Sequence, residues 1–104
     1  MIGRFWRGWA DVENARAYEE LFRERILPEL RDIDGFVGAY VLRNDLEDEV
    51  EILTITLFES MEDVGAFAGE DPHKAHVTPE ARRLLSRFED TVIHYDVLIA
   101  PQGD

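Results

Sequence analysis

Cysteine is absent from the 104-residue chain, and basic side chains are few. Without cysteine the protein forms no disulfide and offers neither a thiolate nucleophile nor ligands for an iron–sulfur cluster. Its 11 lysine and arginine residues stand against 23 aspartate and glutamate residues, a formal net charge of −12. Because nucleic acids and anionic membranes attract basic surfaces, this imbalance argues against both as partners. No segment approaches the ~20 apolar residues of a membrane span, so we expect a reduced, cytoplasmic protein.

The rest of the composition is that of a globular protein, with 45% hydrophobic and 33% charged residues. A chain of this length can bury one hydrophobic core and little more. No linker-like or low-complexity segment interrupts it. We therefore predict one domain spanning residues 1–104.

The first third of the chain predicts a strand followed by a long helix. Residues 2–10 are rich in aromatic side chains, which favour a strand. Asp11 is suited to cap a helix whose apolar residues recur at helical spacing up to Ile33. Pro28 should kink this helix or end its regular part, and Gly35 supplies a turn after it.

The middle third predicts a hairpin and a short helix. Strands over residues 36–43 and 50–58 flank an acidic turn at residues 44–49. Ser60, with an acid three residues later, resembles the capping box of a helix that fades near Gly69.

The last third predicts helical starts and a final strand. Asp71-Pro72 and Thr78-Pro79 each place a capping side chain before a proline, a pattern typical of a helix start. Apolar residues up to Phe88 form one face of a last helix. Residues 91–100 then form the final strand, and residues 101–104 a polar tail.

The resulting order, β–α–β–β–α–β, predicts an α+β protein with the ferredoxin-like split βαβ arrangement. Such a four-stranded antiparallel sheet carries helices on one face and leaves the other open. We expect Leu53, Ile55 and Leu57 to face the helices, which leaves Ile52, Thr54, Thr56 and Phe58 on the open face. An apolar open face this large favours burial in a homodimer.

Four segments carry a resemblance to a known family: IDGFVG at 33–38, LFES at 57–60, FAGEDP at 67–72 and HYDV at 94–97. Through them the chain resembles the antibiotic biosynthesis monooxygenase domains. These belong to the dimeric α+β barrel superfamily, which also contains haem-degrading monooxygenases. The resemblance implies a barrel formed by the sheets of two protomers. It also implies cofactor-independent oxygenation of an electron-rich aromatic, such as a polyketide phenol converted to a quinone.

The predicted pocket is large, aromatic and uncharged. Its candidate substrate-binding residues are Trp6, Tyr18, Tyr40, Phe58 and Phe67. Trp6 and Tyr40 also carry a polar group that can bond a ligand.

The three histidines are the candidate catalytic residues. His73 and His76 would share one face of a helix and serve as a base or an iron ligand, or else form an exposed polar pair. His94 is either a base oriented by Asp96 or a residue that makes hydrogen bonds across the dimer interface. Two histidines without a third ligand do not predict a metal site.

Arg4 and Arg7 occupy opposite faces of the first strand, and an arginine in so apolar a strand needs a carboxylate across the dimer or an anionic ligand group.

The resemblance implies an asparagine and a tryptophan for haem degradation, but Trp6 and Phe67 stand at those positions. His76 lies about one residue from the position of the iron ligand.

The leading hypothesis is therefore a dimeric monooxygenase that acts on a small electron-rich aromatic molecule without a cofactor. The first alternative is a non-catalytic dimer that binds a small apolar metabolite or haem. The second is a structural dimer whose pocket is vestigial.

Overall fold

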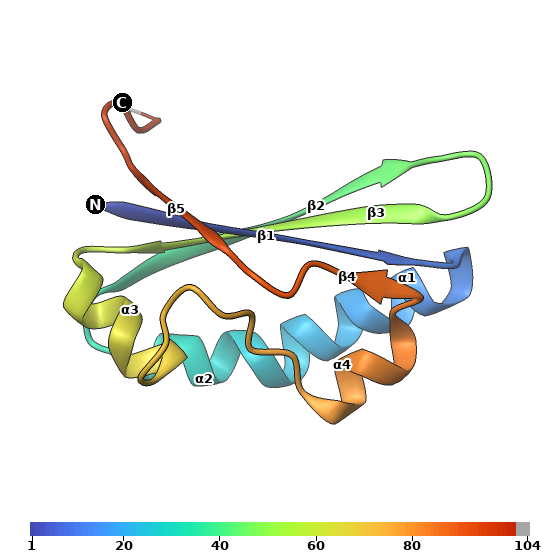
Figure 1. The fold of residues 1–104 in the computed structure, drawn as a ribbon, viewed down its shortest axis with the longest axis horizontal. Helices are drawn as coiled ribbons and strands as arrows, with labels where there is room; N and C mark the ends of the chain where they lie inside the picture. Colours follow the sequence, from blue (N-terminus) through green and yellow to red (C-terminus); the bar gives the residue numbers. More distant parts are fainter. Residues whose placement is uncertain (102–104) are drawn as a thin grey trace.

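A computed structural model describes residues 1–101, so residues 102–104 of the predicted polar tail lie outside the described part. The chain forms an antiparallel sheet with all its helices on one face (Figure 1). The strands are β1 (Ile2–Ala10), β2 (Phe36–Asp45), β3 (Val50–Phe58), β4 (Arg87–Phe88) and β5 (Ile93–Asp96). The helices are α1 (Val12–Leu21), η1 (Phe22–Ile26), α2 (Leu27–Arg31), α3 (Met61–Ala68) and α4 (Pro79–Leu84). The predicted α+β ferredoxin-like fold is confirmed.

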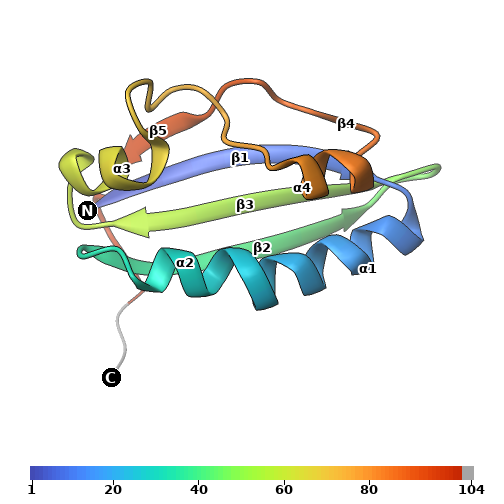
Figure 2. The ribbon, with the colours of Figure 1, turned by 90° about the horizontal axis from the view of Figure 1, so that it is seen from below.

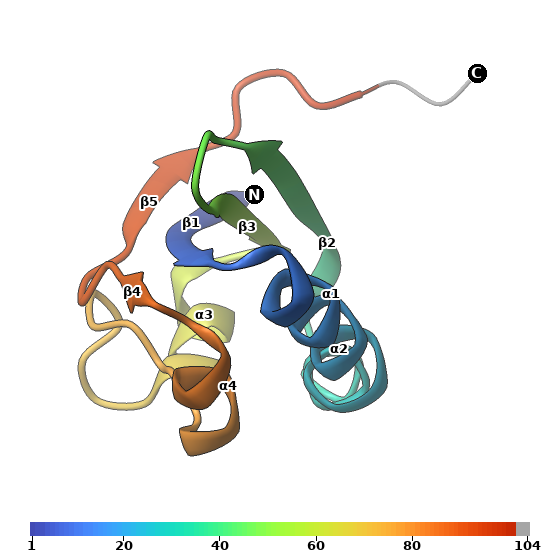
Figure 3. The same ribbon diagram turned by 90° about the vertical axis from the view of Figure 1, so that its right-hand side faces the viewer.

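The sheet has β1 and β3 at its centre. Its order is β2-β3-β1-β4, and β5 pairs with the other end of the same edge of β1. Seen from the helical side, α1, η1 and α2 run along β2, whereas α3 and α4 lie beneath the β1 side (Figure 2). An end view shows these two groups of helices side by side under the sheet (Figure 3).

The inner face of β3 is the opposite of the one predicted. Val50, Ile52, Thr54, Thr56 and Phe58 are buried beneath the helices, and the intervening residues lie on the open face. Both faces of this strand are mainly apolar, so alternation alone cannot identify the inner one. The packing of the helices decides it.

The long N-terminal helix contains the irregularity that Pro28 predicts. Asp11 caps α1 by accepting from the amide of Asn14 at 2.8 Å. Regular α-helical geometry ends at Leu21, and the wider π-helical turn η1 follows, with the amide of Leu27 donating to the carbonyl of Phe22. Proline has no amide and its ring crowds the carbonyl four residues before it, so a widened turn upstream relieves the clash.

The turn between α2 and β2 is joined to the start of α3. Gly35 has φ +88°, and a Cβ atom there would overlap the carboxylate of Asp63. The Ser60 hydroxyl donates to that carboxylate at 2.9 Å and accepts from the Asp63 amide at 3.3 Å. The predicted turn and cap are confirmed, and both meet at Asp63.

The last third differs from the sequence prediction in three places. Asp71-Pro72 begins no helix; the Asp71 carboxylate instead accepts from the amide of His73, which is a local turn. Thr78 does cap α4, but this helix ends at Leu84, whereas we expected it to reach Phe88. The predicted strand over residues 91–100 is present only as Ile93–Asp96.

Hydrogen bonds between distant segments explain the interrupted final strand. The carbonyl of Asp90 accepts from the amide of Ala75, and the amide of Val92 donates to the carbonyl of His73. Between β4 and β5 the chain therefore leaves β1 and pairs with residues 73–75. No helix within residues 1–101 is long and apolar enough to span a membrane.

Candidate functional site

A pocket of about 90 Å³ lies between the inner face of the sheet and the helices. We call it the inner pocket. Its floor consists of Arg4 and Trp6 from β1 and Thr54 and Thr56 from β3. The strand register places Arg4 opposite Thr56 and Trp6 opposite Thr54, so the four side chains are adjacent. Each of the two strands contributes two residues to the floor because alternate residues of a strand share one face.

Aromatic rings form much of the wall. The Trp6 ring stacks on Tyr18, with ring centroids 6.3 Å apart and an interplanar angle of 30°. Phe22 and Phe67 complete this wall. The indole Nε1 of Trp6 donates to the carbonyl of Glu89 at 2.8 Å, so the polar group that we expected to bond a ligand already has a partner.

Arg4 is the buried cation of the pocket, with 5% of its surface exposed. Its guanidinium donates to the carbonyls of Pro72 and Lys74 and lies over the ring of Phe67, 5.7 Å from the centroid. It forms no ion pair with a carboxylate within residues 1–101. Burial lowers the pKa of Arg4 to about 10, which leaves the group charged at neutral pH.

His94 contacts Arg4 and so lies on the helical side of the sheet, not on the open face that the dimer-interface alternative requires. Its Nε2 atom lies 3.1 Å from Nη1 of Arg4. Because a guanidinium only donates, we assign Nε2 as the acceptor, which places the proton of the neutral ring on Nδ1. Burial, followed by the charges of Arg4 and His73, lowers the pKa of His94. The neutral ring is therefore the form present at pH 7.

His73 and His76 are separated because the segment that carries them is not helical. The ring of His73 lies 5.3 Å from that of His94. The ring of His76 packs edge-on against Phe67 at 5.8 Å and lines the inner pocket. Of the three predicted histidines, only His76 is part of the pocket lining.

Two polar groups of the pocket are deeply buried. Burial raises the pKa of the Tyr18 phenol to about 12, and the neighbouring Thr54 side chain acts in the opposite direction. The Tyr18 phenol and the Thr54 hydroxyl are therefore close neighbours, but Oγ1 of Thr54 makes no hydrogen bond of ordinary geometry within residues 1–101. A buried hydroxyl without a partner is unusual in a native protein.

The remaining predicted binding residues lie elsewhere. Phe58 is fully buried and packs between Phe36 and Phe67 in the core, behind the lining. Tyr40 pairs in register with Ile55 on the open face and is 46% exposed. Sequence reasoning did not assign Arg4, Thr54 and Thr56 to the site. The available signal was that Arg4 lies two residues from Trp6 on one strand, and therefore on the same face.

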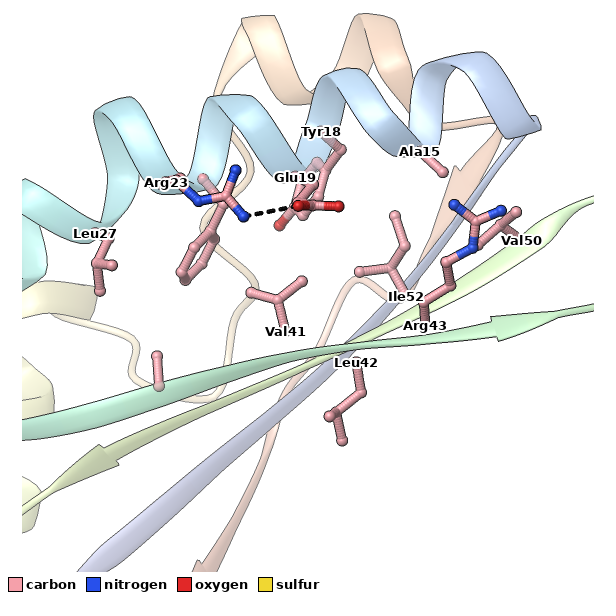
Figure 4. Close-up of a pocket in the computed structure, with 12 residues that line it drawn as sticks. Ala15, Tyr18, Glu19, Arg23, Leu27, Val41, Leu42, Arg43, Val50 and Ile52 are labelled. Atoms are coloured by element: carbon pink, nitrogen blue, oxygen red, sulfur yellow. Dashed lines mark hydrogen bonds and ion pairs between the residues drawn. The ribbon is translucent and has the colours of Figure 1, made fainter.

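A larger groove of about 350 Å³ lies between α1–η1 and the β2 edge of the sheet (Figure 4). Its floor is aliphatic, with Val41 and Ile52 among the residues that line it. The charged side chains around it are paired, since Glu19 bonds Arg23 at 2.7 Å and Arg43 bonds Asp45 at 2.6 Å. Paired charges at an open edge offer no reactive group, so we place the candidate site in the inner pocket. No cluster of three or more potential metal ligands occurs within residues 1–101.

The sequence matches the antibiotic biosynthesis monooxygenase family over residues 1–79. No curated protein matches it closely enough to count as a relative. A structure from Deinococcus radiodurans, provisionally described as an antibiotic biosynthesis monooxygenase, is 15% identical with a TM-score of 0.66, and the match covers 100% of this chain and 99% of that chain. A similarly described structure from Bacillus cereus is 14% identical with a TM-score of 0.61, covering 98% and 96%. The haem-degrader MhuD from Mycobacterium tuberculosis, with two haems in its active site, is 18% identical with a TM-score of 0.66, covering 98% and 100%. At these identities the likeness shows the fold alone.

Proposed function

Because the chain belongs to the antibiotic biosynthesis monooxygenase family, we propose that it oxidises a small, electron-rich aromatic molecule in the inner pocket. The observation that supports this most directly is the stacked wall of Trp6 and Tyr18 beside Phe67. The ring of an aromatic substrate can stack on this wall. Arg4, the single buried cation within residues 1–101, favours a substrate that becomes an anion when it reacts.

The proposed reaction needs little from the protein. A phenol deprotonates, and its anion passes an electron to O2, after which one oxygen atom enters the ring as the second quinone oxygen. The other oxygen atom leaves as water, so one O2 accepts four electrons from the substrate and no other reductant is required. His76 is the proposed base because it lines the pocket. The aromatic wall orients the ring and excludes water.

The size of the pocket limits the substrate. A cavity of about 90 Å³ is smaller than the ~300–1,000 Å³ of pockets that hold drug-sized ligands. A single ring therefore requires some widening, and a fused polyketide requires more. The part of the wall formed by His76, Val77 and Thr78 lies outside helices and strands, which makes it the segment best able to move.

Oxygen uptake tests this proposal. Dihydroxynaphthalene-type and anthrone-type phenols should be consumed faster with the protein than without it, and His76→Ala should lower the rate about 100-fold or more, as expected for a lost general base. Tyr40→Phe, on the open face, is the matched control and should retain the rate. An uptake rate equal to the enzyme-free rate across a broad panel would instead favour a non-catalytic binding module.

Haem is the ligand suggested by the comparison with MhuD, and the inner pocket does not fit it. His76 is the one histidine that lines the pocket, but about 90 Å³ cannot hold a porphyrin. We expect no Soret shift when micromolar hemin is added to the protein. A shift that disappears in His76→Ala would contradict this expectation and favour the haem-binding alternative.

We also propose that the protein acts as a homodimer through the open face of the sheet. Ile93 and Tyr95 on that face are 54% and 51% exposed, and Tyr40 and Leu42 of β2 are also exposed there. A continuous apolar surface of this kind favours self-association. The cytoplasmic location stays a prediction.

A further inference from the structure

The buried charge of Arg4 is only partly compensated. Two backbone carbonyls, the ring nitrogen Nε2 of His94 and one aromatic face surround its guanidinium, but within residues 1–101 no carboxylate pairs with it. A buried charge without a counter-ion is costly. Arg7, three residues along the same strand, bonds both Glu51 and Glu89 on the opposite face. The missing counter-ion is therefore specific to the pocket side of β1.

An unpaired hydroxyl lies in the same pocket. Oγ1 of Thr54 is buried without a partner within residues 1–101, and only 7% of the residue is exposed. The register sets Thr54 opposite Trp6, one pair along from Arg4 and Thr56. Arg4, which has no ion-pair partner within residues 1–101, and the Thr54 hydroxyl thus line one cavity, whose rim also includes the exposed side chain of Glu29.

We propose that the inner pocket binds aromatic molecules that carry a carboxylate group, with the carboxylate on Arg4 and a polar ring substituent on Thr54. This inference deepens the proposed function by naming the chemical class of the substrate. A guanidinium presents its donors as a planar fork that matches the two oxygens of a carboxylate. A phenol is neutral at pH 7, whereas a carboxylate is charged there and supplies the missing anion.

Once the pocket has widened to admit a single ring, the positions of the residues along the strands favour both contacts at once. Arg4 and Trp6 are two residues apart on the same face of β1, so a ring stacked on Trp6 can direct its carboxylate toward Arg4. The ligand then meets the Thr54 hydroxyl opposite Trp6. Arg4 gains a counter-ion, and Oγ1 of Thr54 gains a hydrogen-bond partner.

Arg4 also has a structural role that an experiment must separate from binding. Its bonds to the carbonyls of Pro72 and Lys74 hold the segment between α3 and α4 against β1. A purely structural Arg4 would affect stability but would give no preference between a carboxylate and a neutral group of the same shape.

Calorimetric titration with para-hydroxybenzoate and para-hydroxybenzamide tests the proposal, because the two probes differ mainly in charge. The carboxylate should bind at least about 10-fold more tightly than the amide, the ratio expected for a hydrogen-bonded charge pair. Arg4→Gln should reduce this ratio to about one, and Arg4→Lys should leave it intermediate because lysine keeps the charge and loses the fork. Arg7→Gln, on the opposite face of the same strand, should leave the ratio unchanged.

Thr54→Val separates binding from folding. Valine has a similar shape and removes the unpaired hydroxyl, so the melting temperature should stay equal or rise, while affinity for para-hydroxybenzoate falls several-fold. If Arg4→Gln does not fold, Arg4→Lys and Thr54→Val decide the question.

Three results would overturn the inference: equal affinity for the two probes, no binding of either at millimolar concentration, or a charge preference that persists in Arg4→Gln. The titration requires no turnover. A carboxylate preference without oxygen uptake would therefore support this inference and contradict the monooxygenase proposal, and uptake without the preference would do the reverse.

Discussion

Arg4 and Arg7 show how strongly the environment of a residue depends on the face of a strand. Both belong to β1, but Arg7 is exposed and forms ion pairs, whereas Arg4 is buried against backbone carbonyls and His94. A difference of three residues reverses the face, because side chains of a strand alternate. The sequence indicates that Arg4 needs an interaction partner for its charge, but it does not identify that partner.

At the same scale, position 35 favours glycine because of both its backbone conformation and its neighbour. Its φ of +88° and the adjacent Asp63 carboxylate exclude a side chain. We expect Gly35→Ala to lower the free energy of unfolding by about 2 kcal/mol or more, measured by urea denaturation. Gly38→Ala is the matched control, since a Cβ atom there meets open space, and it should change stability by less than about 0.5 kcal/mol. Equal effects of the two substitutions would contradict this reasoning.

His94 should make stability depend on pH above the range in which carboxylates titrate. Its pKa is lowered in the folded state by burial, Arg4 and His73, so the unfolded chain binds the proton more tightly. By linkage the protein loses stability as pH falls through about 6.5, the ordinary pKa of histidine, and this loss levels off below the folded-state pKa. Denaturant midpoints between pH 7.5 and about 5 should therefore fall in the native sequence and fall less in His94→Asn. Parallel pH profiles would show that His94 is not responsible.

At the scale of elements, the helices begin where short-range signals place them. Asp11, Ser60 and Thr78 each accept from a backbone amide in the first turn of their helix. These bonds span three residues, so sequence spacing is sufficient to predict them. The segment between α3 and α4 is different, because its backbone bonds to residues 90–92.

The cap of α3 provides a test of this local control. Removing the Ser60 hydroxyl leaves the amide of Asp63 without its acceptor and removes the bond to the Asp63 carboxylate. Ser60→Ala should cost about 1 kcal/mol of unfolding free energy, measured by thermal and urea denaturation. Ser60→Thr retains a hydroxyl and should recover most of this loss. A neutral Ser60→Ala would mean that packing alone fixes the start of α3.

At the scale of the whole molecule, one face of the sheet is covered by helices and the other carries exposed apolar side chains. Beyond β5 the chain extends away from the body, where Leu98 and Ile99 are 90% and 88% exposed (Figures 1 and 3). Exposed apolar side chains on the open face and in this segment favour association of two protomers. The proposed dimer would cover them.

Sedimentation velocity at micromolar concentration tests the dimer. The native sequence should sediment as a dimer, and Tyr40→Lys combined with Ile93→Lys should produce a monomer, because both lysines would place charge in the apolar interface. Val12→Lys is the control: Val12 is an exposed apolar residue at the start of α1, on the helical side. A monomeric native protein would contradict the dimer proposal.

Much of the fold follows from the sequence by itself. The bounds of β1 and β3, the caps of three helices, the turn at Gly35 and the end of regular α-helix before Pro28 all depend on residues close together in the chain. The family resemblance used the same framework residues. Local hydrogen bonds and hydrophobic periodicity carry this information, so no knowledge of distant contacts is required.

Only the tertiary structure decided which groups form the site. Because both faces of β3 are apolar, helix packing determined that Thr54 lies inside, while Tyr40 of β2 lies on the open face. The separation of His76 from His73, and the meeting of His94 with Arg4, depend on a segment held by bonds to distant residues. Long-range pairing overrides local signals there, which is why His73 and His76 share no helical face and why His94 lies against the buried Arg4.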